Sequence, residues 1–202
     1  MKFNAHKLGK PFHHLPTADS TQTYLKNLMQ ANEAPIGTLV LTDHQPAGKG
    51  TQGRSWFSLP KPQLMFSLLI QPNLPIKVFP IINILCGILM VKSLKEFEIE
   101  AQVKWPNDIF IQGKKAGGIL SELIDGKVVL GIGVNTEGNE EDFPKELRDI
   151  ATTVSMHGKI DRFDLLNSFL TRLEMALDWS EMELIAFCSS EKILNHEGPI
   201  SF

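Results

Sequence analysis

Apolar positions along the chain repeat with two different periods. In three segments the apolar residues recur about every 3.6 positions, which is typical of helices that bury one face. Six other segments are short apolar runs bounded by turn-forming residues, which is typical of strands. The predicted helices are 20–29, 80–97 and 163–179. The predicted strands are 38–42, 64–70, 101–105, 109–112, 118–124 and 127–134.

The order of these elements predicts the fold class. Asp125-Gly126 separates two apolar runs and is a strong hairpin signal, and Gln112-Gly113 is a weaker one. Asp19 precedes the first helix and is a candidate N-cap. Strands joined by hairpins, with helices between them, indicate a mixed, largely antiparallel sheet with packed helices. We therefore predict an α+β fold and, at 202 residues, a single domain over 1–202.

Composition limits the classes of protein and the compartment. The net charge of -3 argues against a nucleic-acid surface that covers the whole protein. Cys86 and Cys188 are the two cysteines, and free thiols in a reducing compartment are expected rather than a disulfide framework. The uncharged stretch 78–91 is too short to span a bilayer, and residues 1–7 lack the apolar centre of a signal peptide. These features predict a cytoplasmic protein without a membrane partner.

A glycine-rich loop at 45–56 is the first candidate for chemistry. Gly48, Gly50 and Gly53 can hold the backbone in conformations that point successive N–H groups at one anion. Lys49 and Arg54 would add positive charge. The loop is therefore interpreted as an anion site, while an ordinary surface loop with solvated charges stays open as the alternative.

The same three glycines match the spacing of a dinucleotide-binding motif, but the context disfavours that interpretation. Such a motif requires a helix that begins inside the glycine pattern. Here Pro60 and Pro62 follow, and then the predicted strand 64–70. The glycine-lysine pattern of a P-loop is absent as well.

Three further motifs lie where predicted strands end or pass a turn. Lys104-Trp-Pro-Asn-Asp108 places a cation, an aromatic ring, an amide and a carboxylate at the end of one strand. A core tryptophan followed by turn-forming residues would explain part of this motif without function. Lys115-Ala-Gly-Gly-Ile119 and Gly131-Ile-Gly-Val-Asn135 each set glycines beside a polar side chain, so a ligand could approach the backbone closely.

With these motifs the chain resembles the catalytic domain of biotin protein ligases (biotin-[acetyl-CoA-carboxylase] ligases). The resemblance also takes in Asp19-Ser-Thr-Gln22 and Gln45, and it spans 19–135 in the family's order. It implies a fold like the catalytic core of class II aminoacyl-tRNA synthetases. It further implies an ATP-dependent enzyme that forms biotinyl-5'-AMP and transfers biotin to a lysine of the biotin carboxyl carrier protein of acetyl-CoA carboxylase, with Mg²⁺ accompanying ATP.

The resemblance assigns roles residue by residue. Catalytic roles are implied for Lys115, Arg54 and Lys104. Substrate-binding roles are implied for Ser20, Thr21, Gln45, Lys49, Gly50, Gly53, Trp56, Gly117, Gly118 and Asn135. Asp108 is implied as a ligand of Mg²⁺, directly or through water. By the same resemblance Lys115 would hold the biotin carboxylate and the α-phosphate, and Trp56 would cover the adenylate.

The ends of the chain and one loop depart from the family pattern. Only 18 residues precede Asp19, too few for the DNA-binding domain of some members, so no nucleic-acid partner is expected. The chain ends at 196–202, about where the family's C-terminal β-barrel would open. Lys49 and Thr51 stand where many members have arginine. Two alternative functions stay open: a lipoate or octanoate ligase or transferase, and a non-catalytic module that binds biotin or nucleic acid. An exposed sheet edge could also support a homodimer.

Overall fold

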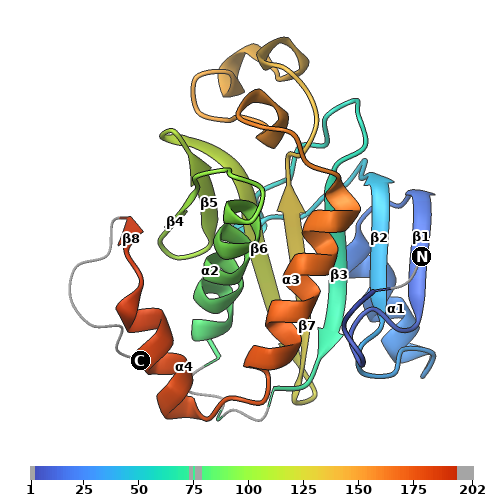
Figure 1. Cartoon of the computed structure of the whole chain (residues 1–202). Helices are drawn as coiled ribbons and strands as arrows, with labels where there is room; N and C mark the ends of the chain where they lie inside the picture. Colours follow the sequence, from blue (N-terminus) through green and yellow to red (C-terminus); the bar gives the residue numbers. More distant parts are fainter. Residues whose placement is uncertain (1–2, 73–74, 76–78, 195–202) are drawn as a thin grey trace.

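An eight-stranded sheet forms the centre of the protein (Figure 1). The computed structural model describes residues 3–72, 75 and 79–194. The strand order is β1-β2-β3-β7-β6-β5-β4-β8, and within it β1 pairs with β2 and β4 with β8 in parallel. The other neighbours are antiparallel. The predicted α+β fold with a mixed, largely antiparallel sheet is therefore confirmed.

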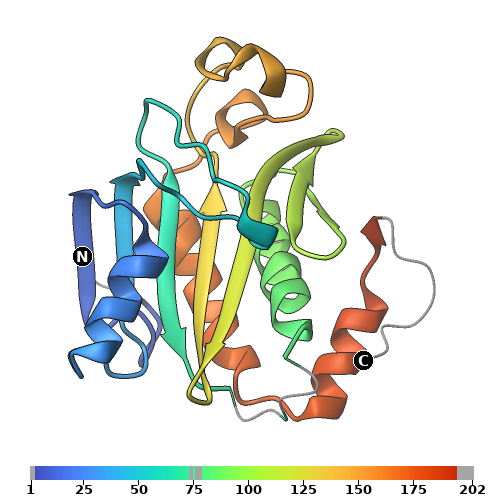
Figure 2. The same cartoon turned by 180° about the vertical axis from the view of Figure 1, so that it is seen from behind.

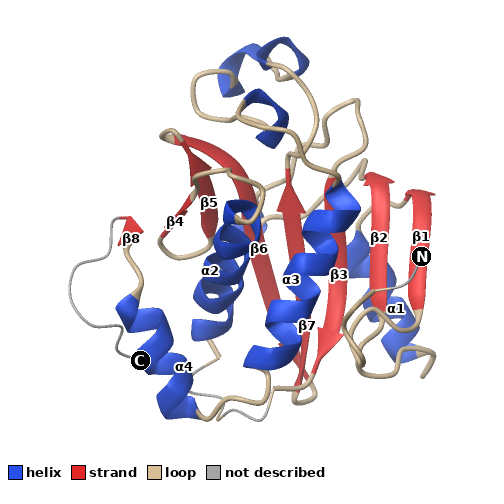
Figure 3. Cartoon of the chain, viewed as in Figure 1, coloured by secondary structure: helices blue, strands red, loops and turns tan. Residues whose placement is uncertain are grey.

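The elements have the following bounds. The strands are β1 (Phe12–Thr17), β2 (Leu39–His44), β3 (Leu64–Ile70), β4 (Gln102–Lys104), β5 (Asp108–Ile111), β6 (Lys114–Ile124), β7 (Lys127–Val134) and β8 (Ile193–Leu194). The helices are α1 (Thr21–Gln30), α2 (Ile81–Lys95), α3 (Arg162–Ala176) and α4 (Glu181–Ser190). Figure 3 colours the helices and strands separately. Short 3₁₀ turns include η1 (Thr51–Gly53) in the glycine-rich loop.

The helices divide unequally between the two faces of the sheet. Helices α2 and α3 pack against one face and bury the main core, in which the Phe66 and Phe169 rings lie 5.8 Å apart. Helix α1 covers only part of the other face, through a small cluster around Leu25 and Val129 (Figure 2). Because one helix cannot cover eight strands, the rest of that face is open to the glycine-rich loop, which crosses it.

Most predicted elements are confirmed, and two details are corrected. Both hairpins form, and Asp125 and Gln112 each adopt the positive φ that such tight turns require. The N-cap of α1 is Ser20 rather than Asp19, because the Ser20 hydroxyl accepts a hydrogen bond from the Thr23 N–H at 3.4 Å. Strands β1 and β8 and helix α4 were not predicted.

The cysteine and membrane expectations can be compared with the structure directly. Cys86 and Cys188 are both free and buried, as expected. Burial raises the pKa of the Cys188 thiol to about 12, so it is not a reactive thiolate near neutral pH. Within the described ranges, no helix has both the length and the apolar character needed to cross a membrane.

A partly buried ion cluster joins α3 to β2. Arg162 Nη2 donates to Asp43 Oδ1 at 2.7 Å, and His14 Nε2 lies 2.8 Å from the same oxygen. Burial by itself would raise the pKa of Asp43, but hydrogen bonds from His14 and Arg162 and the charge of Arg162 outweigh it and lower the pKa. The cluster therefore favours the ionised carboxylate in the folded protein.

We expect the ionised Asp43 carboxylate to stabilise the folded protein near neutral pH and to lose this effect as the pH becomes acidic. A carboxyl group with a lowered folded-state pKa stabilises the protein above its unfolded pKa of about 3.9, and the contribution is lost as pH falls through the folded value. Urea denaturation at a series of pH values should show this decline in the unaltered protein. In Asp43→Asn the acid part of the profile should be flatter, and an unchanged slope would contradict the assignment.

Candidate active site

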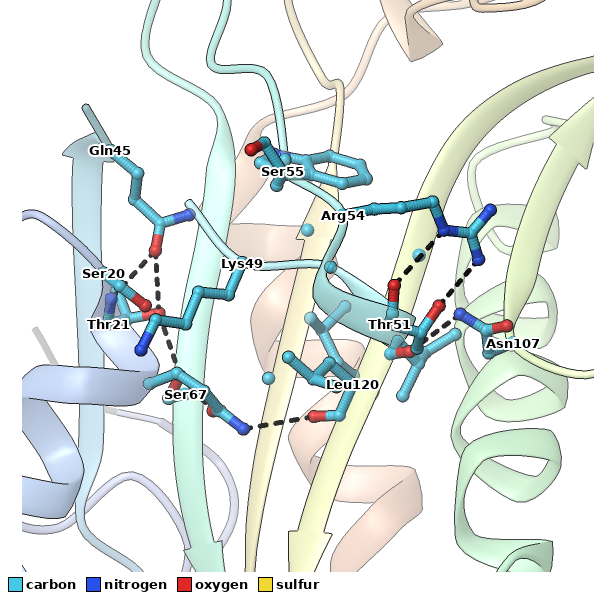
Figure 4. Close-up of a pocket in the computed structure, with 18 of the residues that line it drawn as sticks. Ser20, Thr21, Gln45, Lys49, Thr51, Arg54, Ser55, Ser67, Asn107 and Leu120 are labelled. Carbon is cyan, nitrogen blue, oxygen red and sulfur yellow. Dashed lines mark hydrogen bonds between the residues drawn. The ribbon is translucent and has the colours of Figure 1, made fainter. Parts of the chain in front are cut away.

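A cavity of about 110 Å³ lies on the face of the sheet that α1 leaves open (Figure 4). Helix α1 and the residue before it contribute Ser20, Thr21 and Gln22. The glycine-rich loop contributes Gln45, Lys49, Gly50, Thr51, Arg54, Ser55 and Trp56. The sheet and the turn before β5 contribute Phe66, Ser67, Asn107, Lys115, Gly118, Ile119, Leu120, Gly131, Ile132 and Gly133. Motifs that are far apart in the sequence thus meet around one cavity.

Glycines in β6 and β7 make room on the floor of the cavity. A β-carbon on Gly133 would lie 2.7 Å from the Trp56 ring, and one on Gly131 would lie 2.9 Å from Gln22 Oε1. Real β-carbons essentially never make contacts this short. A larger residue at either position would displace the side chain above it, so glycine permits the close approach seen here.

One end of the cavity is lined by buried polar side chains. Gln45 Oε1 accepts a hydrogen bond from the backbone N–H of Thr21 at 2.8 Å, and the Thr21 hydroxyl oxygen lies 3.2 Å from the same atom. Ser20, Thr21 and Gln45 are all at least nine-tenths buried. A polar ligand that enters this end must therefore match fixed donors and acceptors, because unpaired buried polar groups cost about 1–3 kcal/mol each.

Positively charged side chains also line the cavity, and a β-bulge brings Lys115 into it. Gly118 and Leu120 face the cavity, so a regular strand would turn Lys115, three residues before Gly118, to the opposite face. The register between β5 and β6 shifts at Ile109/Phe110, which re-aims Lys115 toward the cavity. Its ammonium lies 2.6 Å from the carboxylate of Asp108.

The glycine-rich loop supplies the remaining charges and a ring over the floor. Lys49, Arg54 and Lys115 line the cavity, and none of its described lining residues is acidic. Arg54 is exposed, and its guanidinium donates to the Thr51 hydroxyl at 2.9 Å and to the Thr51 carbonyl at 3.2 Å. The ring centroid of Trp56 lies 6.0 Å from the Lys115 ammonium. The cavity is therefore a cationic site partly covered by an aromatic side chain.

Five residues of the predicted set do not line the cavity. The Lys104 ammonium lies over the Phe110 ring, 4.5 Å from its centroid. Gly53 ends η1 on the exposed side of the loop. Gly117 lies beside the cavity floor, where it allows close approach of the Gly133 carbonyl. Asn135 donates a hydrogen bond to the Thr152 carbonyl at 3.2 Å. Asp108 does not line the cavity itself but is paired with Lys115, which does.

Several lining residues were absent from the predicted set. Gln22, Asn107, Gly131 and Gly133 belong to the motifs that carried the resemblance, so the motifs themselves could have indicated them. Ser67 lies outside every motif. Its signal is a polar residue in the middle of the apolar run 64–70, since a hydroxyl in a buried strand needs a partner.

The described residues do not form a metal cage. They contain no group of three or more His, Cys, Asp or Glu side chains arranged to hold a metal ion. Asp108 supplies one carboxylate, which lies 2.6 Å from the Lys115 ammonium. Mg²⁺ usually takes one or two carboxylates and completes its shell with phosphates and water. Asp108 therefore fits an ion that arrives with a nucleotide, but not one held by the protein alone.

Comparison with known proteins agrees with this geometry. The model of the biotin/lipoate A/B protein ligase family matches residues 15–139, more than half of the chain. The chain belongs to this family. All five motifs of the sequence resemblance lie inside the matched region, which confirms that resemblance.

Sequence relatives are named as ligases. The bifunctional ligase/repressor BirA of Bacillus subtilis is 39% identical over 151 residues, which cover 71% of this chain and 46% of that protein. The biotin--[acetyl-CoA-carboxylase] ligase of Mycobacterium tuberculosis is 32% identical over 111 residues, covering 52% of this chain and 42% of that protein. The chain spans about half the length of the curated relatives it matches.

Solved structures share the fold. The biotin protein ligase of Aquifex aeolicus in complex with biotin and ATP superimposes with a TM-score of 0.75 at 34% identity, covering 88% of this chain and 76% of that chain. The biotin acetyl coenzyme A carboxylase synthetase of Helicobacter pylori with bound biotinylated ATP has a TM-score of 0.69 at 26% identity, covering 88% and 80%. The α+β core is therefore that of biotin protein ligases.

Proposed function

We propose that the protein activates biotin with ATP to give biotinyl-5'-AMP and then transfers the biotinyl group to a lysine of a biotin carboxyl carrier protein. The observation that carries this proposal is a single cavity lined both by buried neutral polar groups and by the three cations Lys49, Arg54 and Lys115. Biotin offers matching groups, a cyclic urea at one end and a carboxylate at the other. The family match and the Aquifex aeolicus structure with biotin and ATP support the same ligands.

The polar end orients biotin in this proposal. Thr21 and Gln45, which bond to each other, form the wall that receives the cyclic urea, with Ser20 beside them. The ring system and the acyl chain lie along the glycine floor, where Gly118 and Gly133 leave space. The carboxylate then points toward Lys115, which lines the same cavity.

The first step joins two anions, so the main task of the site is to neutralise and align them. A carboxylate oxygen of biotin attacks the α-phosphorus of ATP, and the bond to the pyrophosphate leaving group breaks. Lys115 lies where it can contact both the carboxylate and the α-phosphate, while Lys49 and Arg54 hold phosphate oxygens. Bound Mg²⁺ would contribute additional neutralisation of phosphate charge, with Asp108 as its protein ligand.

The second step transfers the acyl group. The amine of the carrier lysine attacks the carbonyl carbon of the mixed anhydride, AMP leaves with the bonding electron pair, and the amine loses a proton. A mixed anhydride also reacts with water, so the site must limit access of solvent. Trp56, which already rests against Gly118 and Gly133, provides a cover over the intermediate.

Pyrophosphate release on mixing the protein with biotin and ATP tests the first step. We expect pyrophosphate to form with biotin and not with lipoate or octanoate in its place. A preference for lipoate or octanoate would instead support the lipoyl branch of the family, and binding of biotin without pyrophosphate would support a non-catalytic module. Incorporation of labelled biotin into an isolated biotin carboxyl carrier domain tests the second step.

A further inference from the structure

Ser67 places a hydroxyl on the floor of the cavity at its polar end. The residue is fully buried, and its Oγ lies 2.8 Å from Gln22 Oε1 and 2.9 Å from Thr21 Oγ1 (Figure 4). A hydroxyl group has one proton and two lone pairs. The partner that receives the proton therefore decides whether Ser67 offers a donor or an acceptor to a ligand.

The side-chain amide of Gln22 has one favourable orientation. Its Nε2 faces three oxygen atoms that can only accept hydrogen bonds. They are Glu122 Oε2 at 2.9 Å, the Val129 carbonyl at 3.0 Å and the Leu120 carbonyl at 3.4 Å. The Lys26 ammonium holds Glu122 in place, 2.9 Å from each carboxylate oxygen. Turning the amide over would set its oxygen against these acceptors, so Oε1 must point toward Ser67.

This orientation fixes the polarity of Ser67. An amide oxygen can only accept, so Ser67 donates its one proton to Gln22 Oε1. Two lone pairs remain on Ser67 Oγ. Because the Ser67 proton is used, the 2.9 Å contact with Thr21 Oγ1 requires the Thr21 hydroxyl to donate to Ser67 and not to Gln45 Oε1. This bond uses one of the two lone pairs. The other is left for a ligand. Ser67 Oγ therefore offers a ligand in the cavity a hydrogen-bond acceptor and not a donor.

We propose that Ser67 accepts a hydrogen bond from an N–H group of the substrate's cyclic urea, and that Gln22 is the positioning residue that sets this polarity. The proposal rests on the proposed function and adds a residue that determines specificity. The dithiolane of lipoate and the chain of octanoate have no N–H group there. They would leave the buried lone pair unpaired, whereas a cyclic urea satisfies it.

Calorimetric titration of biotin into the unaltered protein and Ser67→Ala measures the contribution of this hydroxyl. We expect Ser67→Ala to bind biotin about 10-fold more weakly. The matched control is Ser93→Ala, because Ser93 is a buried serine in α2 whose hydroxyl donates to the Leu89 carbonyl and which does not line the cavity. It should keep its biotin Kd within about two-fold. An unchanged Kd in Ser67→Ala would overturn the assignment.

Measuring the Kd of methylated biotins for the unaltered protein and for its variants separates the hydrogen bond to Ser67 from a general loss of packing. Biotins methylated at one or the other urea nitrogen lack one N–H group each. For one isomer, methylation should weaken binding to the unaltered protein by about 10-fold more than to Ser67→Ala. Gln22→Met should also reduce this difference, because it frees the Ser67 proton to point into the cavity. Equal penalties in all three proteins would overturn the proposal.

The same titration keeps the two proposals apart. Failure of the unaltered protein to bind biotin would overturn the proposed function and this inference with it. Tight binding by the unaltered protein and by Ser67→Ala, with the same response to methylation, would overturn only the role of Ser67.

Discussion

Lys115→Met is expected to lower the rate of biotinyl-AMP formation by on the order of 100- to 1000-fold while the protein stays folded. The reason is that Lys115 brings positive charge to the point where the two anionic substrates meet. The bulge in β6 turns this ammonium into the cavity, and Asp108 holds it there at 2.6 Å. Its side chain is 34% exposed, so the substitution removes charge without opening the core. Pyrophosphate release under saturating biotin and ATP measures the loss.

Lys114→Met is the matched control for this effect. Lys114 precedes Lys115 in the same strand, but its ammonium donates to the Arg148 carbonyl at 2.7 Å and does not line the cavity. We expect it to retain adenylate formation within about three-fold, because a partly exposed cation outside the cavity contributes little. Equal loss in both variants would mean that net charge, and not the position of Lys115, controls the rate.

Sequence patterns were sufficient for elements that carry strong local signals. Helices α2 and α3 have long apolar faces, and the β6–β7 hairpin has Asp125-Gly126 at its turn. Strand β1 was missed because it is an edge strand with two histidines and Pro16, and its burial alternates only weakly. Helix α4 was missed although Ser180 and Glu183 form a capping box, because its apolar face is short.

In the candidate site, the direction of the side chains could not be predicted from the sequence. The motifs indicated which segments meet, but not where each side chain points. Lys104 and Lys115 both looked cationic and close to Asp108 in the sequence, yet Lys104 rests on Phe110 while a bulge turns Lys115 into the cavity. A bulge depends on pairing between strands, and local sequence does not mark it. The role of Ser67 depends likewise on three acceptors that surround the amide of Gln22.

Phe169→Ala is expected to lower the free energy of unfolding by about 3–5 kcal/mol, the range observed when a buried phenylalanine is truncated. Phe169 is fully buried in α3 and packs on Phe66 of β3 at 5.8 Å, so its removal leaves a cavity beneath the sheet. Urea denaturation measures the change. Met175→Ala on the same helix should change stability by no more than about 0.5 kcal/mol, because Met175 is 67% exposed.

The same variant tests whether the two faces of β3 are independent. The Phe66 ring packs on Phe169 of α3, although residue 66 also borders the cavity, and the hydroxyl of the next residue, Ser67, faces the cavity. Strand β3 is hydrogen-bonded on both sides, to β2 and β7, and this pairing fixes its backbone without Phe169. We therefore expect the KM for biotin to change by less than about three-fold at a temperature where Phe169→Ala is folded. A large rise in KM would show that packing under the sheet positions the biotin site above it.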